Sequence, residues 1–283
     1  MESPIQNTSS HNIDIKKIFK EKNPGLAPYI PGFVYSYLDR ILHIEFINYF
    51  LEKHGNKYGF EFAEASIQEF NISKDIIGFD NIPESNHVIF ASNHPLGGFD
   101  GMLLITLLGK KFPGLKVLVN DILTNITNMN EIFIPINKHG KQSIEAVRKI
   151  EEIFKAGHPV LTFPSGLVSR KRKGIIRDPE WKKNFVTKAI RHKRDIIPVH
   201  VSGRCTNFFY RLANIRKFLK IKANLEMFFL PDETYRHRNE HIRVIFGQPI
   251  SWKRLDKSKD HSEWAKEIQN FVYELPKNPL TKF

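Results

Sequence analysis

The stretch HVIFASNHPLGGFDGMLLITLL, residues 87–108, decides the fold of this chain. It begins with an apolar run typical of a buried strand. It ends, over residues 102–108, with the pattern of a helix that packs on that strand. The turn between the two carries His94 and Asp100 on either side of the pair Gly97-Gly98. Because open α/β sheets place their reactive groups at the carboxyl ends of their strands, this turn is the first candidate for a functional site.

On both sides of this stretch the chain alternates short β-rich runs with helical patterns. The predicted strands are 75–79, 87–92, 115–120, 132–136, 160–163, 196–201, 225–230 and 243–247. The predicted helices of this region are 101–110, 141–156, 180–192, 207–219 and 262–275. This alternation predicts an α/β fold with a mostly parallel central sheet flanked by helices.

The first part of the chain is predicted to form a separate N-terminal segment, residues 1–70, that packs on an α/β domain of residues 71–283. It contains a polar tail and helical patterns at 13–22, 33–51 and 60–70. The last two patterns have wide apolar faces. They are interpreted either as a helical cap or membrane-facing surface, or as ordinary core helices.

Composition and charge limit the class of protein. The chain has 283 residues, a formal net charge of +13 and a single cysteine, Cys205. This charge indicates an anionic partner, and the lone cysteine excludes an internal disulfide framework and fits a reducing cytoplasm. No run of about 18 apolar residues is present, and the polar start lacks the apolar core of a signal peptide. We therefore expect a cytoplasmic protein that lies on a membrane without crossing it.

The pair His94 and Asp100 indicates acid–base chemistry. An imidazole that a neighbouring carboxylate orients is a general base able to deprotonate an alcohol. Gly97 and Gly98 can adopt backbone angles that fold the carboxylate back onto the ring. The alternative is a strand-to-helix turn whose histidine only caps the helix. Since the sequence offers no equally convincing nucleophile, we expect the alcohol to belong to a substrate.

A second polar loop, FPSGLVSR at residues 163–170, follows another apolar strand. Ser165 suggests a serine hydrolase, but Pro164 precedes it where the nucleophile elbow requires Gly-x-Ser-x-Gly. We expect instead that backbone amides near Gly166, together with Arg170, bind a polar head group or an acyl oxygen. Labelling of Ser165 by a fluorophosphonate would support the hydrolase.

Two further segments complete the pattern. Residues 132–138 form a strand that ends in a cation, Lys138, at the same predicted edge of the sheet. Residues 196–203 form an apolar strand with a proline, which we expect to shape a substrate channel. His200 lies within that strand and is interpreted as a packed histidine.

Taken together, these four segments resemble the glycerolipid acyltransferase superfamily typified by 1-acylglycerol-3-phosphate acyltransferase. That family has four blocks in this order: Asn-His with a downstream Asp, a strand ending in a cation, Phe-Pro-Glu-Gly, and an apolar strand with a proline. In this chain the correspondence covers roughly residues 75–205 and begins with Asn93 and His94.

The chain departs from the family pattern at three places. Five residues separate His94 from Asp100, where four are usual, and Lys138 stands where the family commonly has Arg. Ser165 replaces the Glu that the family uses, with neighbouring cations, for a phosphorylated acceptor. These departures resemble a bacterial subgroup that O-acylates aminolipids such as glycine or ornithine lipids.

The resemblance implies a peripheral O-acyltransferase on the cytoplasmic side of the inner membrane. Its donor would be acyl carrier protein or acyl coenzyme A, with no other cofactor and no metal. Its acceptor would be a lyso-aminolipid, or alternatively lysophosphatidic acid, giving phosphatidic acid. The implied catalytic residues are His94 and Asp100, and the implied substrate-binding residues are Asn93, Gly97, Gly98, Lys138, Ser165, Gly166 and Arg170.

Two basic clusters allow a rival interpretation. One is Arg170-Lys171-Arg172-Lys173, and the other, with interleaved aromatics, covers residues 207–220. Such clusters occur in nucleic-acid-binding proteins, on amphipathic helices that lie on anionic lipid, and on ordinary solvated faces. Because one cluster adjoins the candidate site, we favour lipid headgroups or an acidic acyl carrier. No zinc-finger spacing or nucleotide-binding glycine motif is present.

Overall fold

The computed structural model describes residues 13–22, 24–25, 27–136 and 144–283. The chain divides into two compact units, Met1–Lys57 and Tyr58–Phe283. None of the helices in these described ranges is both long enough and apolar enough to span a bilayer.

The first unit is helical and contains α1 (Ile15–Lys22), α2 (Gly32–Ile41) and α3 (Ile44–His54). The continuous helix predicted over 33–51 is in fact two helices. The break falls at His43, whose backbone is left-handed with φ 51°, so the α-helical path cannot continue through it.

The second unit contains the sheet and the remaining helices. Its strands are β1 (Ser73–Ile77), β2 (Val88–Ser92), β3 (Lys116–Asn120), β4 (Phe133–Ile136), β5 (Val160–Thr162), β6 (Arg170–Arg172), β7 (Ile175–Arg177), β8 (Asp195–Val201) and β9 (His241–Phe246). Its α-helices are α4 (Gly59–Glu69), α5 (Gly98–Leu108), α6 (Ile144–Lys155), α7 (Asn184–Arg191), α8 (Asn207–Phe218), α9 (Leu230–Arg236) and α10 (His261–Glu274). Short 3₁₀ turns lie at η2 (Phe79–Asn81), η3 (Asp121–Asn125), η4 (Thr127–Met129), η5 (Leu225–Phe229) and η6 (Trp252–Arg254), and η1 (Ala27–Tyr29) belongs to the first unit.

The main sheet has seven strands in the order β1-β9-β8-β2-β5-β3-β4. Within it only β8 and β9 pair antiparallel, and every other neighbouring pair is parallel. The predicted mostly parallel sheet is therefore confirmed.

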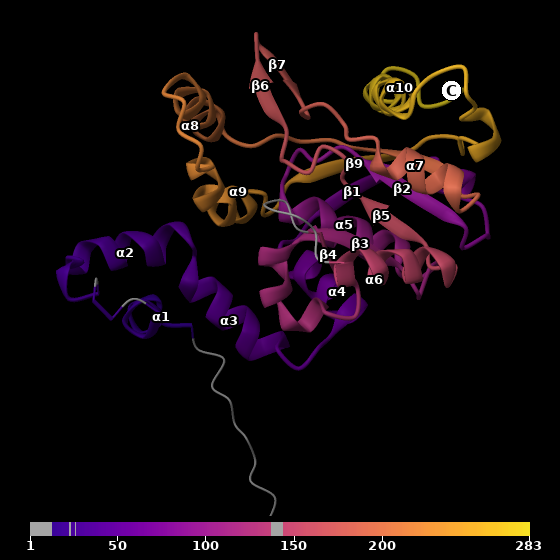
Figure 1. The fold of residues 1–283 in the computed structure, drawn as a ribbon. Coiled ribbons are helices and arrows are strands. Elements are labelled where there is room, and N and C mark those ends of the chain that lie inside the picture. Colours follow the sequence, from indigo (N-terminus) through magenta and orange to yellow (C-terminus); the bar gives the residue numbers. More distant parts are fainter. Residues whose placement is uncertain (1–12, 23, 26, 137–143) are drawn as a thin grey trace, which may run out of the picture. The chain divides into compact units, whose positions relative to one another are not determined.

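Helices cover both faces of this sheet (Figure 1). Ile89 and Ala91 of β2 belong to a buried cluster with apolar residues of α6, α7 and α10. Phe90, between them, is fully buried and meets Phe112, which follows α5, at a ring-centroid distance of 5.4 Å. Because successive strand residues point to opposite faces, β2 must be apolar on both faces, as Val88 to Ala91 are.

The position of β2 fixes the position of the site. It lies in the middle of the sheet and pairs in parallel with both β5 and β8. The carboxyl ends of these three strands therefore meet at one edge. The segments that follow them begin at Asn93, Phe163 and Ser202, and all three were singled out from the sequence.

The predicted boundary at residue 70 differs from the one observed. Helix α4 belongs to the second unit, because it packs along α5. Phe60 lies over Gly109 so closely that a Cβ at Gly109 would come within 2.2 Å of the phenyl ring. The periodicity of residues 60–70 shows an amphipathic helix but not which unit buries its apolar face.

The strand predicted at 225–230 is wrong. These residues form η5 and the start of α9. Pro231 lies in the first turn of α9, where a proline is well tolerated. Glu226 is fully buried against Arg170 and Arg216, and this polar partnership outweighs the β-propensity of the neighbouring Phe and Leu residues.

The hairpin of β6 and β7 was not predicted. Its two-residue turn, Lys173-Gly174, has positive φ at both positions, the conformation that favours a tight hairpin. The strand Arg170–Arg172 consists only of cations, so it lacks the alternation of apolar and polar residues by which a strand is recognised.

The packing of α4 on α5 gives a first prediction. A Gly109→Ala substitution adds a methyl group against Phe60 and the carbonyl oxygen of Ile105, at 2.2 and 2.8 Å. We expect the melting temperature to fall by several degrees, because overpacking costs ~1–3 kcal/mol. Gly32→Ala is the control, since a Cβ there meets nothing within 4 Å. Equal melting curves for the two variants, measured by circular dichroism, would contradict this packing.

Candidate active site

The turn after β2 brings His94 and Asp100 together. His94 Nδ1 lies 2.9 Å from Oδ2 of Asp100, which is in the first turn of α5. The same oxygen accepts the backbone N–H of Leu96 at 2.9 Å, which closes the turn. The imidazole and carboxylate predicted to work as a pair are therefore hydrogen-bonded to each other.

The two side chains differ in their exposure to water. The side chain of Asp100 is fully buried, whereas 18% of that of His94 is exposed. Burial raises the pKa of Asp100, and the hydrogen bonds from His94 and Leu96 act in the opposite direction. With Asp100 accepting a hydrogen bond from Nδ1–H, the Nε2 atom of His94 is left as the proton acceptor.

The two glycines of the turn differ in what the structure requires of them. Gly97 has φ 73°, and a Cβ there would lie 3.2 Å from Leu230 and 3.5 Å from Val168, so both conformation and space require glycine. Gly98 is exposed and begins α5, and a Cβ there would meet nothing within 4 Å. Open space thus adjoins the start of α5 next to His94.

The main chain of His94 is held by the residues on either side of the β6–β7 hairpin. Its carbonyl oxygen accepts the N–H of Ser169 at 2.8 Å, and its own N–H donates to Oδ1 of Asp178 at 3.2 Å. Ser169 Oγ donates to the same Oδ1 at 2.6 Å. The His94 ring packs against the Phe163 ring at a centroid distance of 4.3 Å and an interplanar angle of 30°. His94 is therefore fixed both by its backbone and by its ring.

Asp178 is a buried carboxylate that the sequence did not reveal as functional. Its Oδ2 accepts a hydrogen bond from Nε1 of Trp181 at 3.0 Å, and its own N–H donates to the Tyr273 hydroxyl at 2.8 Å. Burial raises its pKa, as it does for Asp100. Asp178 lies 84 residues after His94 in the chain, so no local pattern connects the two.

Asn93 was predicted to bind substrate, but the structure gives its side chain an internal partner. Its amide donates to the carbonyl of Val201 at 2.9 Å and accepts the N–H of Val201 at 2.7 Å. Asn93 is 2% exposed. Its amide thus joins the ends of β2 and β8, and its position next to His94 is that of a support.

Ser165 and Gly166 form a closed loop. Ser165 Oγ donates to the Leu167 carbonyl at 2.7 Å and accepts the Leu167 N–H at 3.3 Å, and the residue is buried. The Gly166 N–H donates to the carbonyl of Phe163 at 2.9 Å. The amide of Gly166, predicted to be offered to a substrate oxygen, is thus already engaged. Within the described residues Ser165 has no hydrogen bond to a histidine, as a serine nucleophile would require.

Arg170, another predicted substrate-binding residue, is buried in an ion pair. Its guanidinium donates to Glu226 at 2.9 Å and to the Val168 carbonyl at 2.6 Å. Burial lowers its pKa, and the charge of Glu226 acts against that shift. Arg216 donates to the same carboxylate at 2.7 Å. Arg170 thus ties β6 to η5 and α8 instead of presenting its charge to a ligand.

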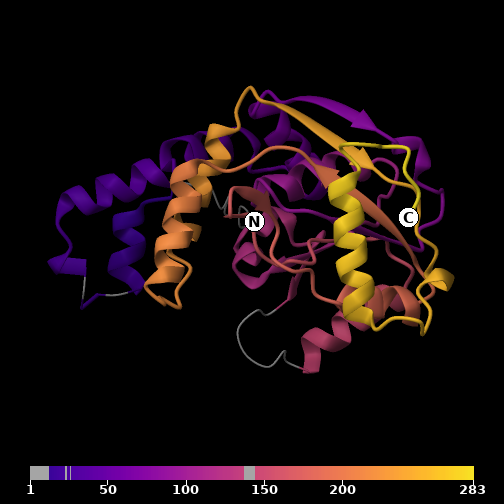
Figure 2. The same ribbon diagram turned by 90° about the horizontal axis from the view of Figure 1, so that it is seen from above.

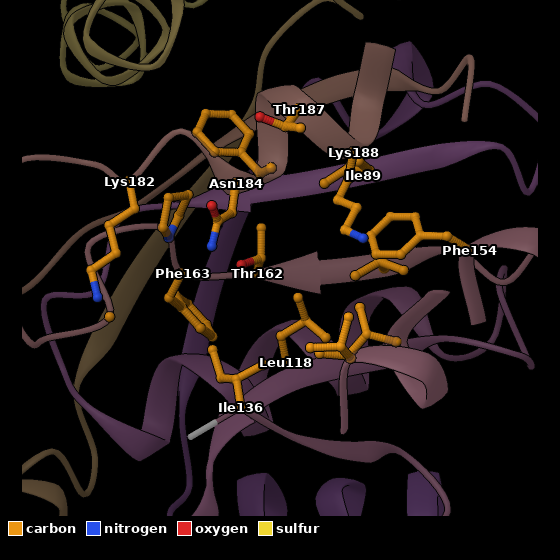
Figure 3. Close-up of a pocket in the computed structure, with 16 residues that line it drawn as sticks. Ile89, Leu118, Ile136, Phe154, Thr162, Phe163, Lys182, Asn184, Thr187 and Lys188 are labelled. Carbon is orange, nitrogen blue, oxygen red and sulfur yellow. The ribbon is translucent and has the colours of Figure 1, made fainter. Parts of the chain in front are cut away.

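A cavity of about 200 Å³ adjoins the site. Its apolar walls come from the sheet, α6 and α7, and Lys182 and Lys188 supply cations (Figure 3). Phe163 lines this cavity and also packs against His94. The Phe163 ring therefore connects the apolar cavity with the imidazole.

The remaining predictions concern three residues. Lys138 lies outside the described residues. His200 is packed as predicted: its pKa is lowered to about 4 by burial, and its ring meets Tyr273 edge-on. Cys205 is buried, and burial raises the pKa of its thiol, which disfavours a cysteine nucleophile. In the described ranges no three His, Cys, Asp or Glu side chains gather into a metal site.

Comparison with known families identifies the class of protein. A model of the acyltransferase family matches residues 17–280, nearly the whole chain. The chain belongs to the acyltransferase family. This membership confirms the resemblance drawn from the four sequence blocks, and the protein is an acyltransferase.

Two curated relatives are similar over almost their full length. A lyso-glycine lipid O-acyltransferase of Bacteroides thetaiotaomicron is 43% identical over 93% of this chain and 97% of its own length. An enzyme with the same name from Phocaeicola vulgatus is 44% identical over 93% of this chain and 95% of its own. Both names agree with the predicted resemblance to acyltransferases of aminolipid synthesis.

A solved structure is also similar to this chain. It is the 1-acyl-sn-glycerophosphate acyltransferase PlsC from Thermotoga maritima, with a TM-score of 0.48 and 16% sequence identity. The match covers 87% of this chain and 97% of that one.

The clamp on the His94 backbone gives a second prediction. We expect Asp178→Ala, which removes the acceptor of the His94 N–H, to lower kcat roughly 10- to 100-fold with little change in KM. The reason is that a small misplacement of the imidazole is costly to the chemical step. Trp181→Phe is the matched control, since it removes a hydrogen bond to the same carboxylate on the side away from His94. It should lower the melting temperature and preserve kcat. Similar kcat values for Asp178→Ala and the wild type, or an equal loss in both variants, would show that Asp178 does not position His94.

Proposed function

We propose that this protein is a peripheral membrane O-acyltransferase that moves a fatty acyl group from a thioester to the hydroxyl group of a lyso-glycine lipid. The observation that carries this proposal is the similarity, over almost the whole chain, to two enzymes named for that acceptor. The hydrogen-bonded pair of His94 and Asp100 supplies the chemistry that such an enzyme needs.

The reaction begins at the acceptor hydroxyl. His94 Nε2 takes the hydroxyl proton while the alcohol oxygen attacks the thioester carbonyl carbon, so a C–O bond forms. Asp100 stabilises the imidazolium that results and holds its tautomer. The tetrahedral intermediate then collapses, the C–S bond breaks, and the leaving thiolate takes the proton back from His94. The products are the ester and the free thiol, and the enzyme is restored.

The oxygen of the tetrahedral intermediate carries a negative charge, which a hydrogen-bond donor of the protein must stabilise. Because the Gly166 amide is engaged by Phe163, we assign this task to the start of α5. Gly98 is exposed there, and its N–H has no acceptor among the residues that the structure describes. The N-terminus of a helix favours an anion, and one such donor typically contributes ~10²–10³ in rate.

The loop of Ser165 favours an acceptor without phosphate. Both hydrogen bonds of its hydroxyl stay within the loop, and Arg170 is paired with Glu226. Neither side chain is therefore placed to bind a phosphate group, which lysophosphatidic acid would present. A lyso-aminolipid makes no such demand.

The donor brings an apolar chain and an anionic carrier. We assign the acyl chain to the cavity behind Phe163, because its walls are mainly apolar and it adjoins His94. The carrier is acyl carrier protein or coenzyme A, both of which the net charge of +13 would attract. We place the enzyme on the cytoplasmic face of the inner membrane, where such thioesters occur together with lysolipids.

An acyl-transfer assay tests this proposal. Purified protein is incubated with labelled acyl thioester and, separately, with lyso-glycine lipid, lyso-ornithine lipid and lysophosphatidic acid. We expect diacylated glycine lipid as the main product. His94→Ala should reduce its formation by ~10³-fold or more, because the alcohol then has no general base.

Each alternative has its own product. Phosphatidic acid as the main product would assign the protein to lysophosphatidic acid acylation and overturn the argument from Ser165. An acylated product formed equally by the His94→Ala protein would rule out the proposed mechanism.

A further inference from the structure

One region of the second unit displays large apolar side chains to solvent. It covers residues 207–228, from the start of α8 through η5, and is called the α8 surface below. Its exposed large apolar residues are Phe208, Ile215, Phe218, Leu219, Ile221, Leu225 and Phe228. Phe218, at the end of α8, is 85% exposed. Large exposed apolar side chains that are concentrated in one region of the chain indicate an interaction site.

The same region is strongly cationic. Residues 204–228 contain six Lys or Arg residues and one acidic residue, Glu226. The carboxylate of Glu226 is buried against Arg170 and Arg216, so it adds no negative charge at the surface. The β6–β7 hairpin, with Lys171-Arg172-Lys173, adjoins α8 and adds further cations (Figure 1).

The turn that ends α8, where Phe218 and Leu219 lie, is held by hydrogen bonds. Lys220 has φ 55°, and the Ile221 N–H donates to the carbonyl of Arg216 at 3.0 Å, which ends the helix. The Arg216 guanidinium donates to the Ile221 carbonyl at 2.9 Å and also to Glu226. Phe218 and Leu219 are therefore presented on a turn that is fixed by hydrogen bonds before any partner binds.

This surface is tied to the active site. The Arg170–Glu226 ion pair joins β6 to η5, and Asn214 of α8 donates to the Lys171 carbonyl at 3.1 Å. Leu230, which directly follows η5, packs near Gly97 of the catalytic turn. A partner bound to the α8 surface therefore lies on the part of the fold that borders His94.

We propose that the α8 surface inserts into the interface of an anionic bilayer and sets the orientation in which His94 meets the lysolipid acceptor. This inference rests on the proposed function and names the surface that this function requires. A bilayer fits both features of the region, since apolar side chains enter the acyl boundary while Lys and Arg bind anionic headgroups. An acidic carrier protein would match the cations but would leave Phe218 and Leu219 without an apolar environment.

Vesicle binding tests the proposal directly. Vesicles of phosphatidylcholine with phosphatidylglycerol are sedimented with the wild-type protein and with F218S/L219S. We expect the vesicle partition coefficient of the variant to be lower by roughly tenfold or more, because two large apolar side chains no longer enter the bilayer. L280S is the matched control: Leu280 is 82% exposed, and it lies near the C-terminus, which both views show well apart from α8 (Figure 2).

Lysine substitutions test whether the cations of the α8 surface bind anionic headgroups. K217Q/K222Q should bind these vesicles more weakly than K257Q/K266Q, although both remove two exposed lysines. The difference should vanish on pure phosphatidylcholine vesicles. All four residues are exposed, so we expect unchanged melting temperatures.

A second measurement detects insertion into the bilayer directly and does not depend on a variant that binds less. F218W should be quenched by brominated acyl chains in the bilayer, whereas L280W should not. Activity on acceptor in detergent micelles should be unchanged in F218S/L219S, which separates membrane docking from the transfer reaction. A wild-type protein that binds vesicles through Phe218 but transfers no acyl group would refute the proposed function and leave the docking surface standing.

Three results would overturn the proposal. Equal vesicle binding by F218S/L219S and the wild type is the first, and absence of F218W quenching is the second. The third is an F218S/L219S variant that binds vesicles as the wild type does but loses activity with the carrier-protein thioester alone. This result would assign the α8 surface to the acyl carrier.

Discussion

The hydrogen bond between His94 Nδ1 and the carboxylate of Asp100 is the interaction on which the proposed chemistry depends. Asp100 is fully buried, so this carboxylate acts in a medium of low polarity, where its effect on the ring is stronger than in water. The surrounding structure serves to keep the two groups 2.9 Å apart while leaving the ring partly open to solvent. This arrangement is the one that the proposed mechanism requires of a general base.

The support for that pair comes from distant parts of the chain that the parallel sheet brings together. Asn93 fastens the end of β2 to Val201. Ser169, just before β6, and Asp178, just after β7, hold the backbone of His94. Phe163 joins this arrangement to the apolar cavity. The active site and the region that we assign to the acyl chain are thus built from the same strand ends.

Sequence reasoning predicted the parts of this structure that local patterns encode. The apolar run of β2 and the turn with two glycines predicted the strand, a helix after it and the pairing of His94 with Asp100. The helix was predicted from residue 101, and α5 begins three residues earlier, at Gly98. The roles of Asn93, Gly166 and Arg170 could not be read in this way, because their partners are Val201, Phe163 and Glu226. From the sequence alone, a polar residue in a loop cannot be distinguished from a substrate-binding residue when its internal hydrogen-bond partner is distant in the chain. Asp178 and the all-cationic strand β6 gave no periodic signal at all.

The most direct test of this account is the pH dependence of kcat/KM for acyl transfer by the wild type and by Asp100→Asn, with the folded fraction checked by circular dichroism. For the wild type, we expect an acid limb, because burial raises the pKa of Asp100 and a protonated Asp100 no longer stabilises a positive charge on the ring. Asp100→Asn should lose ~10³-fold or more across the whole range, because the neutral amide neither holds the tautomer nor stabilises the imidazolium. A folded Asp100→Asn enzyme with nearly wild-type kcat/KM would contradict the central claim.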